Sequence, residues 1–390
     1  MSVLLLNAGS SSLKCSILDQ GGAVVARATI DWAGPVTRYE RSTRNGDRAA
    51  EEVEWRGHAE AVRRALDDLA SRGAPGLVAV GHRIVHGGAF TSAVRVGSEV
   101  RERIAALADL APLHNPPGLE TLRAAEARLP DLPHVAVFDT AFHTTLLPEA
   151  RSYAVPATWS ERWGIRRYGF HGLSHAYAAQ RASELLGRPA AELRLVICHL
   201  GHGCSAAAVR AGRCIDTTMG FTPLDGLMMG TRSGSVDPGI LLHVQLHHGL
   251  TAKDVDHALN HESGLLGVSR VSADMREVLA SASRGDAQAG LAVDMYTHRV
   301  RQAIGALTAT LGGIDALVFT AGVGENSAEI RAASCRGLEC LGLALDADAN
   351  TRCRPDADVA RTDSRARILV IAAREEVTML AEVLHTVGAT

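Results

Sequence analysis

The sequence predicts an α/β protein built from two similar domains, and three observations lead to this prediction. Strand-like and helix-like segments alternate along the whole chain, which is the pattern of α/β architecture. A length of 390 residues is too great for one ordinary hydrophobic core and suits two domains of roughly 150–200 residues. A strand, a glycine- or serine-rich turn and a second strand at 4–14 recur at 196–206, so that Gly201 follows Gly9 by 192 residues. For this repeat taken alone, the alternative is a chance similarity between two hairpins.

Short apolar runs predict buried strands, and helical spacing of apolar residues predicts helices. Strands are expected at 3–6, 77–80, 135–138, 193–198, 317–320 and 368–372. Helices are expected at 58–70, 119–129, 175–186, 286–311 and 376–387. The stretch 34–56 is polar and poorly periodic, so we expect a surface excursion there.

The composition is that of an ordinary globular protein, with 46% hydrophobic and 21% charged residues. A net charge of −3 argues against general binding to nucleic acid or to an anionic membrane, because both need a basic surface. No apolar run reaches the roughly 18–20 residues of a membrane span, and the N-terminal run stops at Asn7 and is typical of a strand. The seven cysteines form no CxxC pair, which favours a reduced cytoplasmic protein over a disulfide framework or a zinc site.

The segment NAGSSSLK at 7–14 joins two apolar strands through a turn rich in glycine and hydroxyls. Such a turn offers backbone N–H groups and small donors, which are what phosphate oxygens require. It is not a Walker A loop, and a plain hairpin turn is the alternative. Lys14 favours the phosphate loop, because the chain has only one other lysine, Lys253.

Two arginines stand between glycines, Arg83 in GHRIVHGG at 81–88 and Arg232 in GTRSG at 230–234. A planar guanidinium in such a place can bind a carboxylate or a phosphoryl group through two parallel hydrogen bonds. A structural salt bridge is the alternative for either one. Two such arginines in one chain suggest two cationic groups directed at one anionic substrate.

Four further places carry candidate chemistry. Asp139 directly follows a buried strand, where ligands of α/β sheets gather, so it suits a metal–phosphate ligand or a base, with a helix N-cap as the alternative. His171 lies between glycines and can approach a ligand closely, or it is a core histidine. The segment 320–326 is strand, glycine turn and helix start, which suits a nucleotide although the full GxGxxG is absent. Glu375 opens the last helix and suits either a metal or the helix dipole.

Taken together and in this order, these motifs resemble the acetate kinase family. NAGSSSLK, GHRIVHGG, FDTAFH and TPLDGLMMGTRSG are a specific set, and the resemblance extends over nearly the whole chain. It implies the fold of acetate and sugar kinases, Hsc70 and actin, which is a duplicated actin-like (ribonuclease H-like) two-domain fold with the active site in the interdomain cleft. It further implies an N-terminal domain of residues 1–140 and 377–390 and a C-terminal nucleotide-binding domain of residues 141–376.

The resemblance also implies an activity and partners. Members of the family are cytoplasmic homodimers that interconvert ATP plus acetate with ADP plus acetyl phosphate, using Mg²⁺, with Mn²⁺ as a possible substitute. Asn7 and Glu375 match the magnesium-site positions, and Asp139 matches the acid near the metal. Arg83 and Arg232 match the arginines that hold the acetate carboxylate and the transferring phosphoryl group.

Other positions match the parts of the family's site that bind phosphate, acetate and adenosine. His171 matches the histidine that hydrogen-bonds the phosphoryl group. The remaining matches are Ser10, Ser12 and Lys14 for the phosphate loop; His199, Gly201, His202 and Gly203 for a phosphate-facing turn; Val85, Leu113, Phe170 and Pro223 for the pocket around the acetate methyl; and Asp274, Met275, Arg276, Gly322, Val323, Gly324, Glu325 and Asn326 for the adenosine-binding stretches.

A carboxylate acceptor is already ionised at neutral pH and needs no general base, so we expect Asp139 to organise the metal and to take no proton. Val85 occupies a place where a smaller residue would admit another methylene, which favours acetate as the substrate. The alternatives are a propionate or butyrate kinase of the same family, and a non-catalytic ATP-binding switch of the actin or Hsc70 kind.

The chain departs from the family's pattern at several positions. His202 stands for the Asn of HLGNG, Leu173 for a Thr, Ser235 for an Asp and Arg374 for an Asn, while GGIGEN reads AGVGEN at 321–326. None of these changes removes a residue assigned to chemistry. They leave the nucleotide affinity, the metal affinity and the pH optimum open. They also leave open a further alternative, a divergent homologue that binds nucleotide but turns over slowly.

Overall fold

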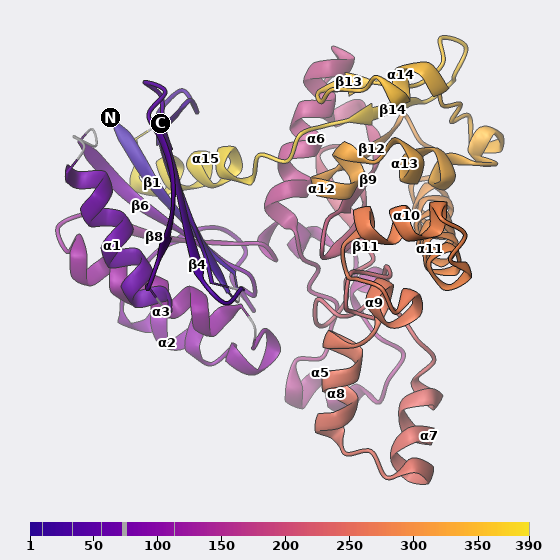
Figure 1. Cartoon of the computed structure of the whole chain (residues 1–390), viewed down its shortest axis with the longest axis horizontal. Helices are drawn as coiled ribbons and strands as arrows, with labels where there is room; N and C mark the ends of the chain where they lie inside the picture. The colour runs from indigo at the N-terminus through magenta and orange to yellow at the C-terminus, as the bar shows by residue number, and fades with distance from the viewer. Residues whose placement is uncertain (10, 33, 56, 72–75, 113, 390) are drawn as a thin grey trace. The chain divides into compact units, whose positions relative to one another are not determined.

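Two β-sheets, each in its own compact unit, organise the chain in the computed structural model (Figure 1). The structure describes residues 1–9, 11–32, 34–55, 57–71, 76–112 and 114–389. The first unit comprises Met1–Phe142 and Arg374–Thr390, and the second comprises His143–Ala373. In the described ranges, no helix combines the length and the apolar composition that crossing a membrane needs.

The sheet of the first unit has eight strands in the order β5-β4-β3-β2-β1-β6-β8-β7. Neighbouring strands from β1 to β5 are antiparallel, whereas β1, β6 and β8 are parallel. The parallel half brings the carboxyl ends of three strands to one edge of the sheet. The strands are β1 (Ser2–Ala8), β2 (Ser12–Asp19), β3 (Val24–Asp31), β4 (Thr37–Thr43), β5 (Arg48–Val53), β6 (Leu77–Ile84), β7 (Val94–Arg95) and β8 (His134–Phe138).

Helices cover the sheet of the first unit. These are α1 (His58–Ser71), α2 (Ser98–Ala105), α3 (Asn115–Arg128) and α15 (Glu375–Val387), with short helices η1 (Ala108–Leu110) and η2 (Ala141–Thr145). Helices α1 and α3 pack on each other and on the strands around β1, and α15 packs on β6. Gly81 of β6 permits this close approach, because a side-chain carbon there would lie 2.6 Å from Cγ2 of Val383.

The sheet of the second unit has six strands in the order β11-β10-β9-β12-β14-β13. They are β9 (Arg194–Leu200), β10 (Cys204–Arg210), β11 (Arg213–Thr217), β12 (Ala316–Thr320), β13 (Ala357–Asp358) and β14 (Arg367–Val370). Its helices are α4 (Pro148–Arg151), α5 (Ala157–Trp163), α6 (Gly172–Leu186), α7 (Pro238–His248), α8 (Ala252–His261), α9 (Gly264–Ser269), α10 (Met275–Ser283), α11 (Ala287–Leu311), α12 (Ala321–Asn326), α13 (Ala328–Cys335) and α14 (Ala347–Thr351), with η3 (Ala190–Glu192) and η4 (Leu338–Leu341). Helix α11 packs on β9 and β10, and α6 packs on β9 and β12.

The two sheets share one topology, so the prediction of a duplicated α/β architecture is confirmed. In each sheet three antiparallel strands are followed by two parallel strands and a short antiparallel edge strand, as β3-β2-β1-β6-β8-β7 and as β11-β10-β9-β12-β14-β13. The hairpin turns at Gly9 and Gly201 connect the equivalent pairs β1–β2 and β9–β10. The repeat seen in the sequence is therefore a repeat of the fold.

Every strand and helix expected from periodicity is present, but the surface excursion expected at 34–56 is wrong. Strands β4 and β5 occupy it and extend the antiparallel half of the sheet. Alternate residues of β4 are buried, Thr37 and Tyr39 among them, while Arg38 and Glu40 between them are exposed. The antiparallel end of the sheet, with β5 at its edge and β4 beside it, buries one face only, so the composition of these strands stays polar.

Candidate functional site

Arg83, near the end of β6, is the centre of a polar cluster in the first unit. Its Nε donates to Oδ1 of Asp139 at 3.0 Å, and its Nη2 donates to Oδ2 of the same carboxylate at 2.6 Å. Its Nη1 donates to Oδ1 of Asn7 at 2.9 Å, and Glu375 Oε2 lies 3.8 Å from Nε. The structure thus brings together four residues that the sequence predicted for the site, from β1, β6, the end of β8 and the start of α15.

The cluster is largely buried and electrostatically matched. The Asp139 side chain is only 1% exposed, and that of Arg83 is 15% exposed. Burial alone would lower the pKa of the Arg83 guanidinium, but the carboxylates of Asp139 and Glu375 raise it above its usual value. Arg83 is therefore a permanent cation, and the two hydrogen bonds that it donates to Asp139 fix the plane of its guanidinium.

The predicted phosphate loop follows directly on β1. The Gly9 N–H donates to the Ser12 carbonyl at 2.8 Å, which closes the turn. Lys14 is exposed and is the register partner of Asn7 across β1 and β2, so the two side chains leave the sheet on the same face. Ser10 lies outside the described residues. Nε2 of His58 lies 2.8 Å from the Gly9 carbonyl, a contact from α1 that motif reasoning missed.

The loop after β6 is held by two side chains that the sequence did not single out. Asn115 accepts from the His86 N–H and donates to the His86 carbonyl, both at 3.0 Å. The hydroxyl of Thr140 accepts from the Gly87 N–H at 3.0 Å. Val85 is buried within this fixed loop, whereas Leu113, predicted with it, lies outside the described residues.

Arg232 is the corresponding cation of the second unit, but its surroundings differ from those of Arg83. Its Nη1 donates to the Pro223 carbonyl at 2.7 Å, and in the described part of the chain no carboxylate forms an ion pair with it. Burial lowers the pKa of Arg232, which still leaves it charged at neutral pH. A half-buried cation without a protein anion is suited to an anionic ligand.

His171 and Arg232 converge on Gly203. A side-chain carbon on Gly203 would lie 2.7 Å from Arg232 Nη2 and 3.4 Å from His171 Nε2, so both nitrogen groups lie close against this glycine, and a larger residue there would collide with Arg232. His171 caps α6 with a φ of 57°, a left-handed conformation that is uncommon outside glycine and is typical of functional positions. Its ring stacks on that of His199, with 4.1 Å between the ring centroids. Phe170, predicted for the methyl pocket, is buried beside it.

The turn 201–203 lies among the other predicted nucleotide residues of this unit. A side-chain carbon on Gly201 would lie 3.7 Å from that of Ala321, the first residue of α12, which carries the stretch 322–326. The ring of His202 packs against Gly230, and burial followed by the charge of Arg232 lowers its pKa, so His202 is neutral at neutral pH. Asp274 caps α10, where Met275 is buried, and its carboxylate is paired with the guanidinium of Arg276.

A buried arginine fixes α12, and sequence reasoning missed it. Arg331 is 2% exposed, and its Nη1 donates to the carbonyls of Gly324 and Glu325 at 2.9 and 2.8 Å. Its Nε and Nη2 bind Asn350 Oδ1 and the Asn350 carbonyl at 2.7 and 2.9 Å. Every partner is an uncharged oxygen, so the cation stabilises the C-terminal carbonyls of this short helix.

Three residues at which the chain departs from the family's pattern, Ser235, Leu173 and Arg374, lie near the predicted site residues in the sequence. The Ser235 hydroxyl donates to Asp225 Oδ1 at 2.6 Å and accepts from the Gly226 N–H at 3.0 Å, which orders the loop that contains Pro223. Leu173 is buried in the first turn of α6, and Arg374 is exposed just before α15. None of the three substitutes for a residue of either cluster.

The first cluster also contains the oxygen donors that a hard cation requires. Asp139 and Glu375 supply carboxylates and Asn7 supplies an amide oxygen, all within reach of one guanidinium. Mg²⁺ is commonly bound by one or two carboxylates together with waters and substrate phosphates. In the described part of the chain, no group of three or more His, Cys, Asp or Glu side chains is placed to hold a metal ion.

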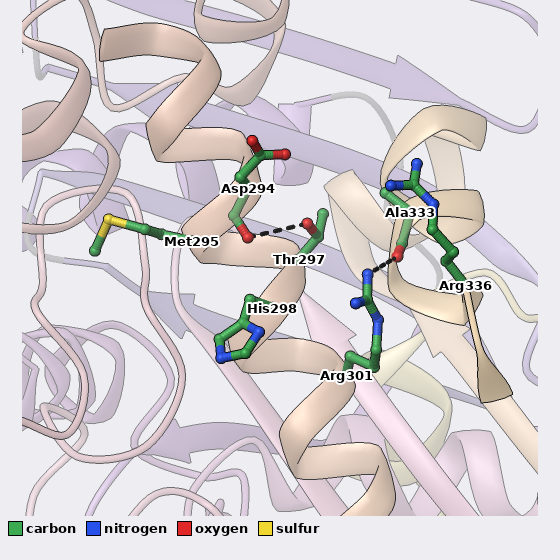
Figure 2. Close-up of a pocket in the computed structure, with 7 residues that line it drawn as sticks. All are labelled: Asp294, Met295, Thr297, His298, Arg301, Ala333 and Arg336. Carbon is green, nitrogen blue, oxygen red and sulfur yellow. Dashed lines mark hydrogen bonds between the residues drawn. The ribbon is translucent and has the colours of Figure 1, made fainter. Parts of the chain in front are cut away.

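Two surface hollows lie away from these clusters. One, of about 480 Å³, is lined by residues of α11 and α13 and by Arg336 (Figure 2). There the Arg301 guanidinium donates to the Ala333 carbonyl at 2.6 Å and the Thr297 hydroxyl to the Asp294 carbonyl at 3.2 Å. The other, of about 520 Å³, lies beside β8 and includes Arg101 and His134. Neither is lined by a predicted site residue.

Comparison with known sequences identifies relatives over the full chain. The family described as the acetokinase family matches residues 2–382. An acetate kinase of Gloeobacter violaceus is 48% identical over 395 residues, which cover 96% of this chain and 97% of the relative. An acetate kinase of Nostoc sp. is 46% identical over 403 residues, covering 99% of each.

Solved structures give the same result. The crystal structure of Porphyromonas gingivalis acetate kinase is 37% identical, with a TM-score of 0.91 and 99% coverage of each chain. That of a propionate kinase from Francisella tularensis is 36% identical, with a TM-score of 0.93 and coverage of 98% of this chain and 99% of the other. Because each comparison covers 98% or more of this chain, the likeness extends to both units of the fold.

Replacing Asp139 with alanine should destabilise the first unit by about 3 kcal/mol or more, because it leaves a buried guanidinium without its bidentate partner. Urea unfolding followed by circular dichroism measures this change. The matched control is Asp363→Ala, which removes the partner of Arg361 from a pair whose side chains are 58% and 66% exposed, and it should change the stability far less, because solvent screens this pair. Equal losses in the two variants would contradict the buried pair.

Proposed function

The chain belongs to the acetokinase family, and on this premise we propose that it is an acetate kinase. The reaction is the reversible transfer of a phosphoryl group from ATP to acetate, which gives ADP and acetyl phosphate. The recognition of the family from its motifs is confirmed, and so is the actin-like α/β fold that this recognition implied. The curated relatives are named as acetate kinases, which are phosphotransferases with a carboxyl group as acceptor.

The observation that carries this proposal is the convergence of Arg232 and His171 on the space beside Gly203. Phosphoryl transfer is mostly positioning and charge stabilisation, and charge spreads over the equatorial oxygens of the transferring group. The Arg232 guanidinium, which forms no ion pair with a carboxylate among the described residues, and an imidazole nitrogen of His171 both lie beside Gly203 and can supply donors for those oxygens. A protein that binds ATP as a switch and transfers no phosphoryl group would not need this pair of donors, Arg232 and His171.

In the first unit, we assign to Arg83 the binding of an anionic oxygen of the substrate. Asp139 fixes the plane of its guanidinium through two hydrogen bonds, so the orientation of Arg83 is set before substrate binds. Acetate is ionised at neutral pH and attacks without a general base. We therefore assign to Asp139 a role in orienting Arg83 and organising the metal region, without taking a proton.

Asn7, Asp139 and Glu375 are the residues that we assign to Mg²⁺, or to Mn²⁺ in its place. When bound, the metal neutralises charge on the phosphate oxygens of the nucleotide. The protein's own contribution is an oxygen-rich edge, in which Arg83 keeps the carboxylates apart and correctly oriented.

Nucleotide binding is assigned to the second unit, residues 143–373. The turn 201–203, the stretch 322–326 and residues 274–276 are the proposed contacts, and the Arg331 guanidinium holds the second of these in place. Ser12 and Lys14 of the first unit are assigned to the phosphates. His202 supplies a neutral imidazole where an amide is usual in the family.

Propionate or butyrate phosphorylation is the alternative within the family, and similarity to the Francisella tularensis propionate kinase supports it. The proposed methyl pocket comprises Val85, Leu113, Phe170 and Pro223, of which Val85 and Phe170 are buried. We favour acetate because all of the relatives compared at 46–48% identity are named acetate kinases.

We further propose a cytoplasmic homodimer in which α7 contacts the partner. Helix α7 has apolar residues spread around its axis, yet none of its residues is buried. Ile240, Leu242 and Leu246 are 52%, 60% and 75% exposed. An apolar helix without a buried face needs a partner.

The cysteines bear on the proposed cytoplasmic location. All seven cysteines lie in the described ranges without a disulfide, which supports a reducing compartment.

Arg232→Ala should lower kcat about a thousandfold or more, because an arginine on the transferring phosphoryl group contributes on that scale. The measurement is acyl hydroxamate formation from acetate, ATP and Mg²⁺ in the presence of hydroxylamine. Lys253→Ala, at an exposed position outside both clusters, is the control and should match the wild type. Activity of Arg232→Ala within threefold of the wild type would refute the assignment, and no hydroxamate from any short acid would refute the kinase.

Val85→Ala should raise the ratio of propionate to acetate kcat/KM about tenfold or more, because the pocket gains room for one methylene. Steady-state kinetics with C2, C3 and C4 acids measures the ratio. Val36→Ala, at a residue that is 42% exposed, is the control and should leave the ratio unchanged. An unchanged ratio in Val85→Ala would remove this residue from the acid pocket.

Leu246→Asp should convert the proposed dimer to a monomer, because it places a charge on the most exposed apolar side chain of α7. Size-exclusion chromatography with light scattering gives the mass. Leu185→Asp on α6, at a residue that is 38% exposed, is the matched control and should stay dimeric. A wild-type protein of monomer mass would refute the dimer, and a dimeric Leu246→Asp would refute its placement on α7.

A further inference from the structure

A single hydroxyl joins two histidines behind the proposed phosphoryl site. Ser205 Oγ, on β10, lies 2.9 Å from Nδ1 of His171 and 2.8 Å from Nε2 of His175. Both histidines belong to the start of α6, His171 as its cap and His175 in its first turn. Ser205 and His175 are completely buried, so solvent does not compete for these bonds.

The protonation of His175 follows from its surroundings. Burial lowers its pKa well below the usual value, and the neighbouring His143 and His199 lower it further, so the ring is neutral and carries one proton. Its Nδ1 is buried and finds no hydrogen-bond partner among the described residues. A buried N–H without an acceptor is rarer than a buried acceptor without a donor, so the proton belongs on Nε2. That N–H donates to Ser205 Oγ.

The proton on His175 also fixes the direction of the hydrogen bond between Ser205 Oγ and His171 Nδ1. Since Ser205 Oγ accepts from His175, its own hydrogen is available for His171 Nδ1. A neutral His171 that accepts at Nδ1 carries its proton on Nε2. That nitrogen lies beside Gly203, together with Nη2 of Arg232.

We propose that Ser205 and His175 are positioning residues, which hold His171 in the tautomer whose Nε2–H donates to the transferring phosphoryl group. This inference rests on the proposed function, because the phosphoryl group is the acceptor of that N–H. The stacking of His199 on His171, and its own bond from Nδ1 to Ser174 Oγ at 2.8 Å, hold the ring plane but do not select the tautomer. The chain from His175 through Ser205 reaches Nδ1 of His171 and favours this choice of proton.

A double-mutant cycle tests the coupling. Ser205→Ala should lower kcat about tenfold to a hundredfold, the range typical of removing a group that orients a reacting side chain, with KM for ATP and acetate little changed. In a His171→Ala background, Ser205→Ala should cause no further loss, because Ser205 then has nothing to orient. Losses that multiply would overturn the proposal, since they would show that Ser205 acts independently of His171.

The matched control is Ser334→Ala. Ser334 is also completely buried in the second unit, and its hydroxyl has no hydrogen-bond partner among the described residues, so its removal should leave kcat unchanged. Circular dichroism confirms that each variant is folded. If Ser205→Ala does not fold, Ser205→Cys keeps the volume and a weaker donor, and the same cycle is measured with it.

The tautomer is read directly by long-range ¹H–¹⁵N NMR on protein labelled with ¹⁵N-histidine, with His171→Gln to assign the signals. We expect an unprotonated Nδ1 and a protonated Nε2 on His171 in the wild type, and a mixture of tautomers in Ser205→Ala. A proton on Nδ1 in the wild type would overturn the inference. Because the NMR readout needs no turnover, it tests the inference even if the wild type forms no hydroxamate, an outcome that would refute the proposed function alone.

Discussion

The guanidinium of Arg83 ties together the strand ends on which the first unit's site depends. Its hydrogen bonds reach Asn7 at the end of β1 and Asp139 just after β8, and Glu375 at the start of α15 lies within ion-pair distance. Without a central cation, two carboxylates and an amide oxygen would be buried at one sheet edge with little to balance them. The parallel half of the sheet brings these residues to the same edge, and the charge of Arg83 makes the arrangement stable.

Three arginines show how differently one side chain can be used in this protein. Arg83 has carboxylates as partners, and Arg331 is satisfied by neutral oxygens alone. Arg232 engages one carbonyl through Nη1, and its Nη2 lies close against Gly203. Arg83 and Arg331 stabilise the fold around them through these bonds. Arg232 forms no ion pair with a carboxylate in the described part of the chain, so its guanidinium differs from that of Arg83 in its partners.

The sequence was sufficient for the local features and insufficient for those that depend on distant contacts. Arg83, Arg232 and His171 could be singled out as candidates because glycines near them in the sequence mark close approach, and the strands around them are short apolar runs. The roles of His58, Asn115, Arg331 and Ser205 could not, because each contacts a backbone or side-chain group that only the fold brings near. Strands β4 and β5 escaped prediction for a related reason, since the pairing of β4 with β3 and of β5 with β4, and not their composition, makes them strands.

Helix α15 packs on β6 of the first unit, although the whole second unit separates the two in the sequence. During synthesis the ribosome therefore releases all of residues 143–373 before the first sheet receives its last covering helix. The second unit is continuous and can complete its core first. Until then, the β6 surface around Gly81 that accepts Val383 is uncovered, so the nascent chain exposes an apolar sheet face for the time needed to translate more than half of its length.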